Sequence, residues 1–118
     1  MLRKFLRVKI KGAVVTEAKL YYEGSITLDK NIIEKSGLLP GEEVLVLNLN
    51  NGARFVTYVI EGEKDSGVVC LNGPAARLGY PGDELIILSF AYLNQDEIAS
   101  HTPRLMVLDK NNKVIEIK

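Results

Sequence analysis

The dipeptide Gly24-Ser25 could carry out an unusual reaction, in which a serine hydroxyl attacks the peptide carbonyl just before it. The attack needs an uncommon backbone conformation, which a glycine at position 24 permits because it has no Cβ atom. The resulting ester can undergo elimination across the serine Cα–Cβ bond, which breaks the chain and leaves dehydroalanine, and this hydrolyses to a pyruvoyl group. A pyruvoyl ketone can form a Schiff base with an amine and accept the electrons that a decarboxylation releases.

Taken alone, Gly24-Ser25 is explained more simply as a turn that leads into a strand. A second candidate is the β-type run that starts at Arg54, where alternation places Arg54 and Tyr58 on one face and Thr57 on the other. The guanidinium of Arg54 could bind a carboxylate, and the phenol of Tyr58 could deliver a proton. The ordinary alternative is an exposed arginine and a tyrosine packed at a rim.

Other polar positions have two interpretations each. Lys9 is one of three basic residues on a strand face, where a solvated lysine is the ordinary interpretation. Asn72 opens a Gly/Pro loop that leads into a helix, so it could donate to an oxyanion or simply begin a capped helix. His101 is the only histidine and lies in a polar stretch, while Cys70 has the flanks of a core residue. No His/Cys cluster has metal-ligand spacing, so no metal is expected.

The hydrophobic pattern predicts a mainly β protein with short helices and a single domain over residues 1–118. The expected strands cover residues 4–11, 25–28, 43–49, 54–60, 68–71, 84–93, 104–109 and 114–117. Short helices are expected over 30–36, ended by Gly37, and over 94–100, with a helical turn starting at Thr16. Asn51-Gly52 predicts a tight hairpin turn.

An internal repeat is visible in the sequence. The segment 37–47, GLLPGEEVLVL, returns as 79–88, GYPGDELIIL, and each copy follows an expected short helix and leads into an apolar strand. Two such units predict a pseudo-two-fold, six-stranded β-barrel whose interior is filled by side chains, so a site would lie at its rim or between subunits. The alternative is that Pro-Gly-acidic is a common turn that occurs twice by chance.

The overall composition excludes several classes of protein. The 118 residues include 15 basic and 15 acidic side chains, and this zero net charge argues against a nucleic-acid or anionic-membrane partner. No apolar run is long enough to cross a bilayer, and the basic N-terminus lacks the features of a signal peptide. A single cysteine favours a reducing compartment, and the cytoplasm is expected.

Several motifs together resemble the pyruvoyl-dependent aspartate 1-decarboxylases of the pantothenate pathway. They are Tyr22-Glu23-Gly24-Ser25, Asn51-Gly52 with Arg54, Thr57-Tyr58, and Asn72-Gly73 with Ala75-Ala76-Arg77, in matching order and spacing up to about Phe90. The resemblance implies a double-psi β-barrel, assembled as a homotetramer with sites between subunits, that converts L-aspartate to β-alanine and CO2. It also implies self-cleavage into residues 1–24 and 25–118.

The resemblance further implies a role for each matching residue. Ser25 becomes the covalent pyruvoyl cofactor, Tyr58 donates a proton after CO2 leaves, and Lys9 and Arg54 bind the substrate carboxylates. Thr57 and Asn72 support the acyl shift and the surrounding site, and the remaining walls come from Tyr22, Gly73, Pro74 and Ala75. Lys11 occupies a position at which many relatives carry histidine.

A second resemblance points to another function. Residues 25–30 and 37–44 are similar to the swapped-hairpin barrels of AbrB-like transcription regulators, which would make the chain a dimeric DNA-binding protein with an inert Gly24-Ser25. This match covers only a short stretch, and the balanced charge gives no phosphate-binding surface. A catalytically silent interaction module is a third alternative.

Overall fold

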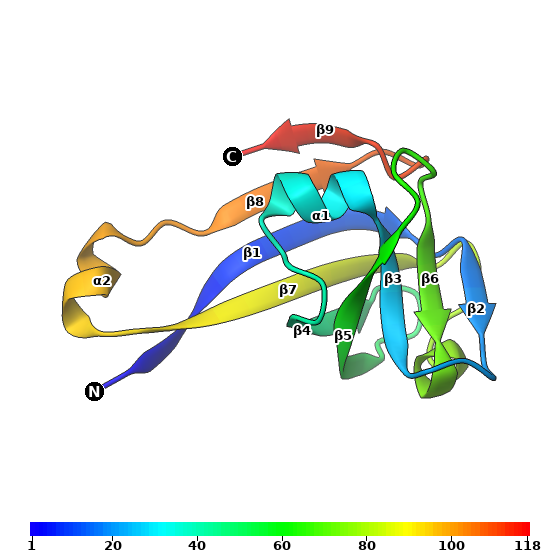
Figure 1. Cartoon of the computed structure of the whole chain (residues 1–118), viewed down its shortest axis with the longest axis horizontal. Helices are drawn as coiled ribbons and strands as arrows, with labels where there is room; N and C mark the ends of the chain where they lie inside the picture. The colour runs from blue at the N-terminus through cyan, green and yellow to red at the C-terminus, as the bar shows by residue number, and fades with distance from the viewer.

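A computed structural model describes all residues, 1–118, and has nine strands, two short α-helices and a 3-10 helix (Figure 1). The strands are β1 (Arg3–Val14), β2 (Glu17–Lys19), β3 (Ser25–Asp29), β4 (Glu43–Asn48), β5 (Arg54–Gly62), β6 (Val69–Asn72), β7 (Glu84–Leu93), β8 (Arg104–Leu108) and β9 (Val114–Ile117). The helices are α1 (Lys30–Ser36), η1 (Gly73–Arg77) and α2 (Gln95–Ser100). None of them has the length and apolar composition that crossing a membrane requires. The prediction of a mainly β chain with short helices is confirmed.

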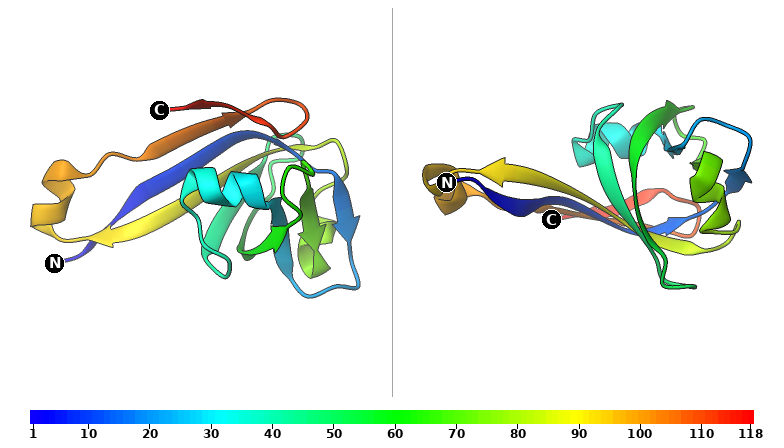
Figure 2. Two further views of the ribbon diagram at one scale, coloured as in Figure 1. Left: turned by 45° about the horizontal axis from the view of Figure 1, so that its top comes forward. Right: turned by 90° about the horizontal axis from the view of Figure 1, so that it is seen from below.

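The nine strands form one hydrogen-bonded sheet in the order β2-β6-β3-β5-β4-β7-β1-β8-β9. Six strands, β6 to β1, are central, and β2, β8 and β9 extend the sheet beyond them. Strand pairing does not close the sheet, but Thr16 N, just after β1, donates to Val69 O at 2.8 Å and so brings the chain beside β6. The strands therefore curl around a common interior (Figure 2).

The strands bury one face because their sequences alternate. On β1, Val8 and Ile10 are 2% and 0% exposed, whereas the intervening Lys9 and the following Lys11 have more exposed side chains. On β3 and β6, the cross-strand pair Ile26 and Leu71 is completely buried. Nineteen buried apolar residues form a single hydrophobic cluster that holds the central strands in place.

The two copies of the internal repeat have the same local structure. Gly41 and Gly82 adopt φ values of 89° and 97°, which the Pro-Gly turn requires and which other residues rarely adopt. Gly41 N donates to Val59 O at 2.7 Å, and Gly82 N donates to Val15 O at 2.8 Å. In each copy, the backbone N–H of that valine in turn donates to the carbonyl of the residue that follows the glycine. The repeat is therefore structural as well as sequential.

The helical turn predicted from Thr16 is wrong. The Thr16 hydroxyl donates to Val69 O and accepts from Val69 N, both at 3.0 Å, and so it bonds across to β6 instead of capping a helix. The following residues form β2, which runs parallel to β6. Tertiary pairing with a neighbouring strand outweighed the local capping signal.

The far end of the molecule is an extended arm. The paired ends of β1 and β7 leave the curled part of the sheet and carry α2, which contributes no buried residue (Figure 1). His101 follows α2 and lies on this arm, where its Nε2 is 2.7 Å from Leu6 O and its ring meets Phe5 edge-on. Since α2 and the start of β3 lie at opposite ends of the molecule, His101 does not pair with Ser25.

Asp29 fixes the other end of the strand that begins at Ser25. Its carboxylate caps α1 by accepting from Asn31 N at 2.8 Å and also accepts from Asp65 N and Gly67 N at 2.9 and 2.8 Å. Burial alone would raise the pKa of Asp29, but these backbone hydrogen bonds outweigh it and the pKa lies below the usual value. Asp29 therefore stays ionised at neutral pH and ties β3 to α1 and to the loop before β6.

Candidate active site around Gly24 and Ser25

A cavity of about 290 Å³ lies where three segments meet: the residue before β3, the first half of β5, and η1. Five of the predicted site residues line this cavity: Gly24, Thr57, Tyr58, Pro74 and Ala75. Phe55, Val56 and Leu78 complete the lining. The fold thus brings together residues from three separate parts of the sequence. The sheet order explains their meeting, because β3 lies between β5 and β6, and η1 follows β6 directly.

The edge of β5 explains why the adjacent Thr57 and Tyr58 line the same cavity, although alternation points them to opposite faces. β5 pairs with β4 over Arg54 to Tyr58, without a bulge, but it pairs with β3 only from Val59 onward. Residues 55–58 therefore present an unpaired edge beside Gly24, and both faces of the strand border the opening. Both side chains therefore border the opening without a bulge in β5.

Ser25 is completely buried just behind Gly24. Its hydroxyl donates to Glu23 O at 3.0 Å and accepts a hydrogen bond from Asn72 Nδ2 at 3.1 Å. Asn72 lies directly opposite Ser25 in the antiparallel β3–β6 ladder, and it makes no side-chain cap to η1. Of the two interpretations of Asn72, the helix cap is therefore wrong, and its amide binds the serine instead.

The two glycines of the site differ in backbone conformation. Gly24 does not have a positive φ. The positive φ lies at Gly73, at 66°, where a Cβ atom would come within 2.7 Å of Tyr22 O and 2.8 Å of Gly24 Cα. A glycine at 73 thus allows the end of β6 to lie against the chain just before Ser25.

Gly73→Ala is expected to destabilise the fold more than a glycine replacement that strains the backbone alone. The alanine must adopt a positive φ and must also displace the Tyr22–Gly24 segment, so we expect a loss of about 3 kcal/mol or more in the free energy of unfolding. Gly52→Ala is the matched control, because Gly52 has φ 75° with no neighbour within 4 Å, and it should lose only about 1 kcal/mol. Urea unfolding measures both, and equal losses would show that the close contact at Gly73 is unimportant.

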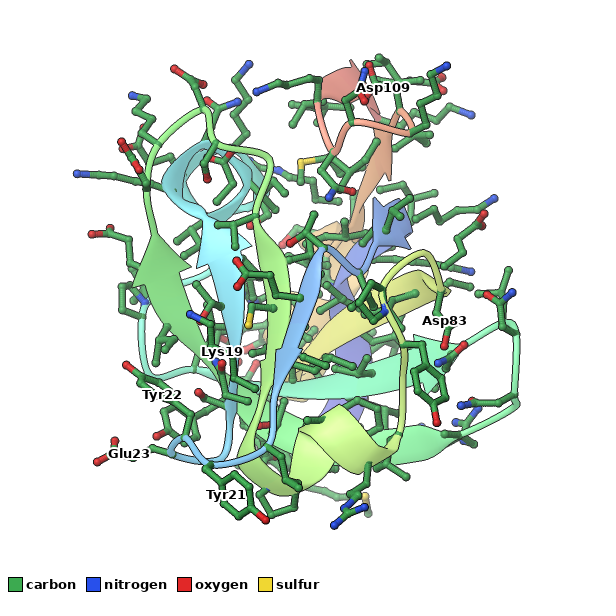
Figure 3. All side chains as sticks on the ribbon, turned by 90° about the vertical axis from the view of Figure 1, so that its right-hand side faces the viewer. Lys19, Tyr21, Tyr22, Glu23, Asp83 and Asp109 are labelled. Carbon is green, nitrogen blue, oxygen red and sulfur yellow. The ribbon has the colours of Figure 1, made fainter.

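Lys9, Arg54 and Tyr22 are not among the residues that line the cavity. Lys9 lies on β1 between Leu88 and Leu105, and Arg54 is exposed at the start of β5; neither makes an ion pair. Tyr22, which is 54% exposed, lies in the turn between β2 and β3, and Figure 3 shows Tyr21, Tyr22 and Glu23 together at this outer turn. A single chain therefore does not bring the two predicted cations to the cavity.

Two residues beside the site were missed in the sequence. Asn72 Nδ2 also donates to Thr27 Oγ1 at 2.8 Å, and Cys70 Sγ donates to Asn72 Oδ1 at 3.2 Å. Their positions were a usable signal, because residues two apart on a strand share a face, and Thr27 and Cys70 are two residues from Ser25 and Asn72. Burial raises the pKa of the Cys70 thiol, so the thiol remains protonated at neutral pH.

The fold and the cavity define a small, mainly β protein with a buried serine at the start of a strand. Comparison with known proteins gives the family: the family model described as aspartate decarboxylase matches residues 1–115, and the chain belongs to this family. The aspartate 1-decarboxylase of Staphylococcus epidermidis is 52% identical over 99% of this chain and 91% of its own. The aspartate 1-decarboxylases of Thermoanaerobacter pseudethanolicus and Bacillus pumilus are 50% and 48% identical, over 99% and 97% of this chain and 100% and 90% of their own.

The family match also decides between the alternatives that the sequence left open. It extends over residues 1–115, which include every residue that lines the cavity. The similarity to AbrB-like regulators is confined to residues 25–30 and 37–44. The chain is therefore an enzyme of the decarboxylase family, and the regulator and the silent interaction module are not supported.

Proposed function

We propose that this chain decarboxylates L-aspartate to β-alanine and CO2, using a pyruvoyl group that it makes from Ser25. Membership of the aspartate decarboxylase family and near-complete similarity to aspartate 1-decarboxylases support the reaction. The observation that carries the mechanism is the position of the buried Ser25 hydroxyl, between the Asn72 amide and the Glu23 carbonyl and directly behind the cavity residue Gly24. The β-alanine would supply pantothenate synthesis, and the single buried cysteine suits a reducing cytoplasm.

Self-cleavage is the first step. The Ser25 oxygen has one lone pair engaged by Asn72 Nδ2 and its proton directed to Glu23 O, so its second lone pair is free to attack the Gly24 carbonyl carbon. The Gly24–Ser25 amide becomes an ester, and the Ser25 nitrogen takes up the hydroxyl proton. Loss of the Ser25 Cα proton then expels Gly24 as a carboxylate, and one water replaces one ammonia at position 25. The site residues therefore fit formation of the pyruvoyl group.

Cleavage is expected to leave both fragments in one fold. The small fragment, residues 1–24, contains β1, which pairs with β7 on one side and with β8 on the other. It also contains β2, which pairs with β6. The buried Val8, Ile10 and Ala13 add apolar contacts that do not depend on the Gly24–Ser25 bond.

The cavity residues supply the remaining functions. When formed, the pyruvoyl group supplies a carbonyl that holds the substrate amine and accepts the electron pair left when CO2 departs. Tyr58 is 37% exposed and borders the same cavity as Gly24, and its phenol donates a proton to the former Cα of aspartate. Phe55, Val56 and Pro74 give the cavity a mostly apolar wall, which favours release of a carboxylate as neutral CO2.

The positions of Lys9 and Arg54 are best explained by an assembly of several chains. Lys9 is partly exposed and Arg54 is exposed, and both lie unpaired outside the cavity of their own chain. The two carboxylates of aspartate, however, require cations at the cavity. We therefore propose the double-psi barrel and the homotetramer of the family, with at least Lys9 reaching the cavity of a neighbouring subunit. Tyr58, which borders the cavity beside Gly24, would act within its own chain.

Mixing two inactive variants tests this arrangement. Ser25→Ala and Lys9→Ala chains should each be inactive alone, but their co-expression should restore about a quarter of the wild-type activity, since that share of randomly assembled sites is intact. Ser25→Ala mixed with Tyr58→Phe is the matched control and should restore nothing, because Ser25 and Tyr58 belong to the same chain and no mixed assembly brings both intact residues to one cavity. Activity is measured as β-alanine formed from L-aspartate. No recovery with Lys9→Ala would place Lys9 in the same chain or outside the site.

A further inference from the structure

Four polar residues share one face of the β3–β6 ladder. Ser25 lies directly opposite Asn72, and Thr27 lies directly opposite Cys70. The other face of the same ladder carries the buried pairs Ile26–Leu71 and Leu28–Val69, so it belongs to the hydrophobic core. The polar face is also buried: Ser25, Asn72 and Cys70 are 0%, 1% and 3% exposed.

The hydrogen bonds within this polar cluster all run in one direction. Cys70 Sγ is 3.2 Å from Asn72 Oδ1, and as a protonated thiol it is the donor. Asn72 Nδ2 then uses its two N–H groups for Ser25 Oγ at 3.1 Å and Thr27 Oγ1 at 2.8 Å. The Ser25 hydroxyl in turn donates to Glu23 O at 3.0 Å. Cys70 supplies the one hydrogen bond that the structure gives to the Asn72 amide oxygen.

We propose, building on the function given above, that Cys70 is a positioning residue for self-cleavage and fixes the orientation of the Asn72 amide. The two ends of an asparagine amide have nearly the same shape, so only their hydrogen-bond partners decide which end faces the serine. Cys70 can donate to the amide oxygen, whereas it accepts only weakly from the amide nitrogen. The thiol therefore selects the orientation in which the N–H groups face Ser25 and Thr27.

The reversed orientation would hinder the attack. The amide oxygen would then accept the Ser25 proton, drawing it away from Glu23 O, and no N–H group would hold the serine oxygen in place. Loss of the thiol donor makes the two orientations closer in free energy, so fewer chains carry Ser25 ready to attack. Loss of one hydrogen bond of this kind corresponds to about a tenfold slower cleavage.

Three variants separate hydrogen bonding from packing. In precursor made by cell-free synthesis, Cys70→Ala should cleave about tenfold more slowly than wild type, and Cys70→Ser, which keeps a donor, should stay within about threefold. Val69→Ala is the matched control, because Val69 is its fully buried neighbour on the opposite face, and it should lower the melting temperature with little effect on cleavage. Cleavage is followed over time by denaturing mass spectrometry.

An infrared measurement tests the thiol bond without any cleavage. Cys70 is the only cysteine, so the chain has a single S–H stretching band. In uncleaved Ser25→Ala protein this band should lie at lower frequency than in Ser25→Ala/Asn72→Ala protein, where the acceptor is gone. An unshifted band, wild-type cleavage by Cys70→Ala, or equal slowing by Cys70→Ser or Val69→Ala would each overturn the role of Cys70. Absence of cleavage in the wild type would instead overturn the proposed function, while the infrared result would still report on the bond.

Discussion

Ser25→Ala is expected to fold, to remain one uncleaved chain of about 13.1 kDa, and to form no β-alanine from L-aspartate. The substitution removes the only atom at position 25 that can attack the Gly24 carbonyl, so neither the ester nor the later pyruvoyl group can form. Folding should survive, because alanine fits the buried position and the Asn72 amide keeps its hydrogen bond to Thr27. Denaturing mass spectrometry reports cleavage, and a β-alanine assay reports turnover.

Ser36→Ala is the control for this result. Ser36 is also a buried serine, 1% exposed, whose hydroxyl donates to a nearby backbone carbonyl, Ile33 O, at 3.0 Å. It lies at the end of α1 and does not line the cavity. We expect this variant to cleave and to turn over like the wild type. Wild-type turnover by Ser25→Ala would refute the pyruvoyl mechanism, whereas loss of activity in both variants would point to a general folding defect.

Tyr58→Phe is expected to separate cleavage from catalysis. The phenol is not hydrogen-bonded to Ser25, so cleavage should proceed at the wild-type rate. Decarboxylation should have a kcat lower by about 10²–10⁴-fold, the usual contribution of a positioned proton donor, with little change in KM. Denaturing mass spectrometry measures cleavage, and steady-state kinetics with L-aspartate measure kcat and KM.

Tyr80→Phe provides the comparison, because Tyr80 is 78% exposed and lies outside the Gly24 cavity. Its kcat and its cleavage should both be unchanged. A Tyr58→Phe enzyme with wild-type kcat would assign the proton to another group, and Thr57 is the other hydroxyl that lines the cavity. Failure of Tyr58→Phe to cleave would instead give the phenol a role in maturation.

Most of the strands could be predicted from the sequence because their hydrophobic residues follow the period of two. The expected strands over 84–93 and 114–117 match β7 and β9 at both ends, and the expected helix over 30–36 matches α1, with its left-handed end at Gly37. Thr16 misled the prediction, because a threonine before Glu17 has the same local pattern whether it caps a helix or bonds to another strand. The pairing of β2 with β6 joins residues far apart in the chain, and no local pattern encodes it.

The candidate site was predictable in its residue types but not in its geometry. Gly24, Thr57, Tyr58, Pro74 and Ala75 were named from motifs, and the structure places all of them around one cavity. The contact between Ser25 and Asn72 depends on the register of two strands whose residues are 47 positions apart, so the sequence left the helix cap as an equal alternative. The positive φ at Gly73 depends on the packing of the end of β6 against residues 22–24, and no local pattern in the sequence indicates it.

Mass spectrometry of a preparation that actively forms β-alanine tests the central proposal most directly. We expect two chains, residues 1–24 and 25–118, with the larger one lighter by one ammonia than a chain that begins with serine and resistant to Edman degradation. The small chain should end in a free carboxylate at Gly24. An intact chain with unmodified serine at position 25, in protein that is fully active, would contradict the proposal.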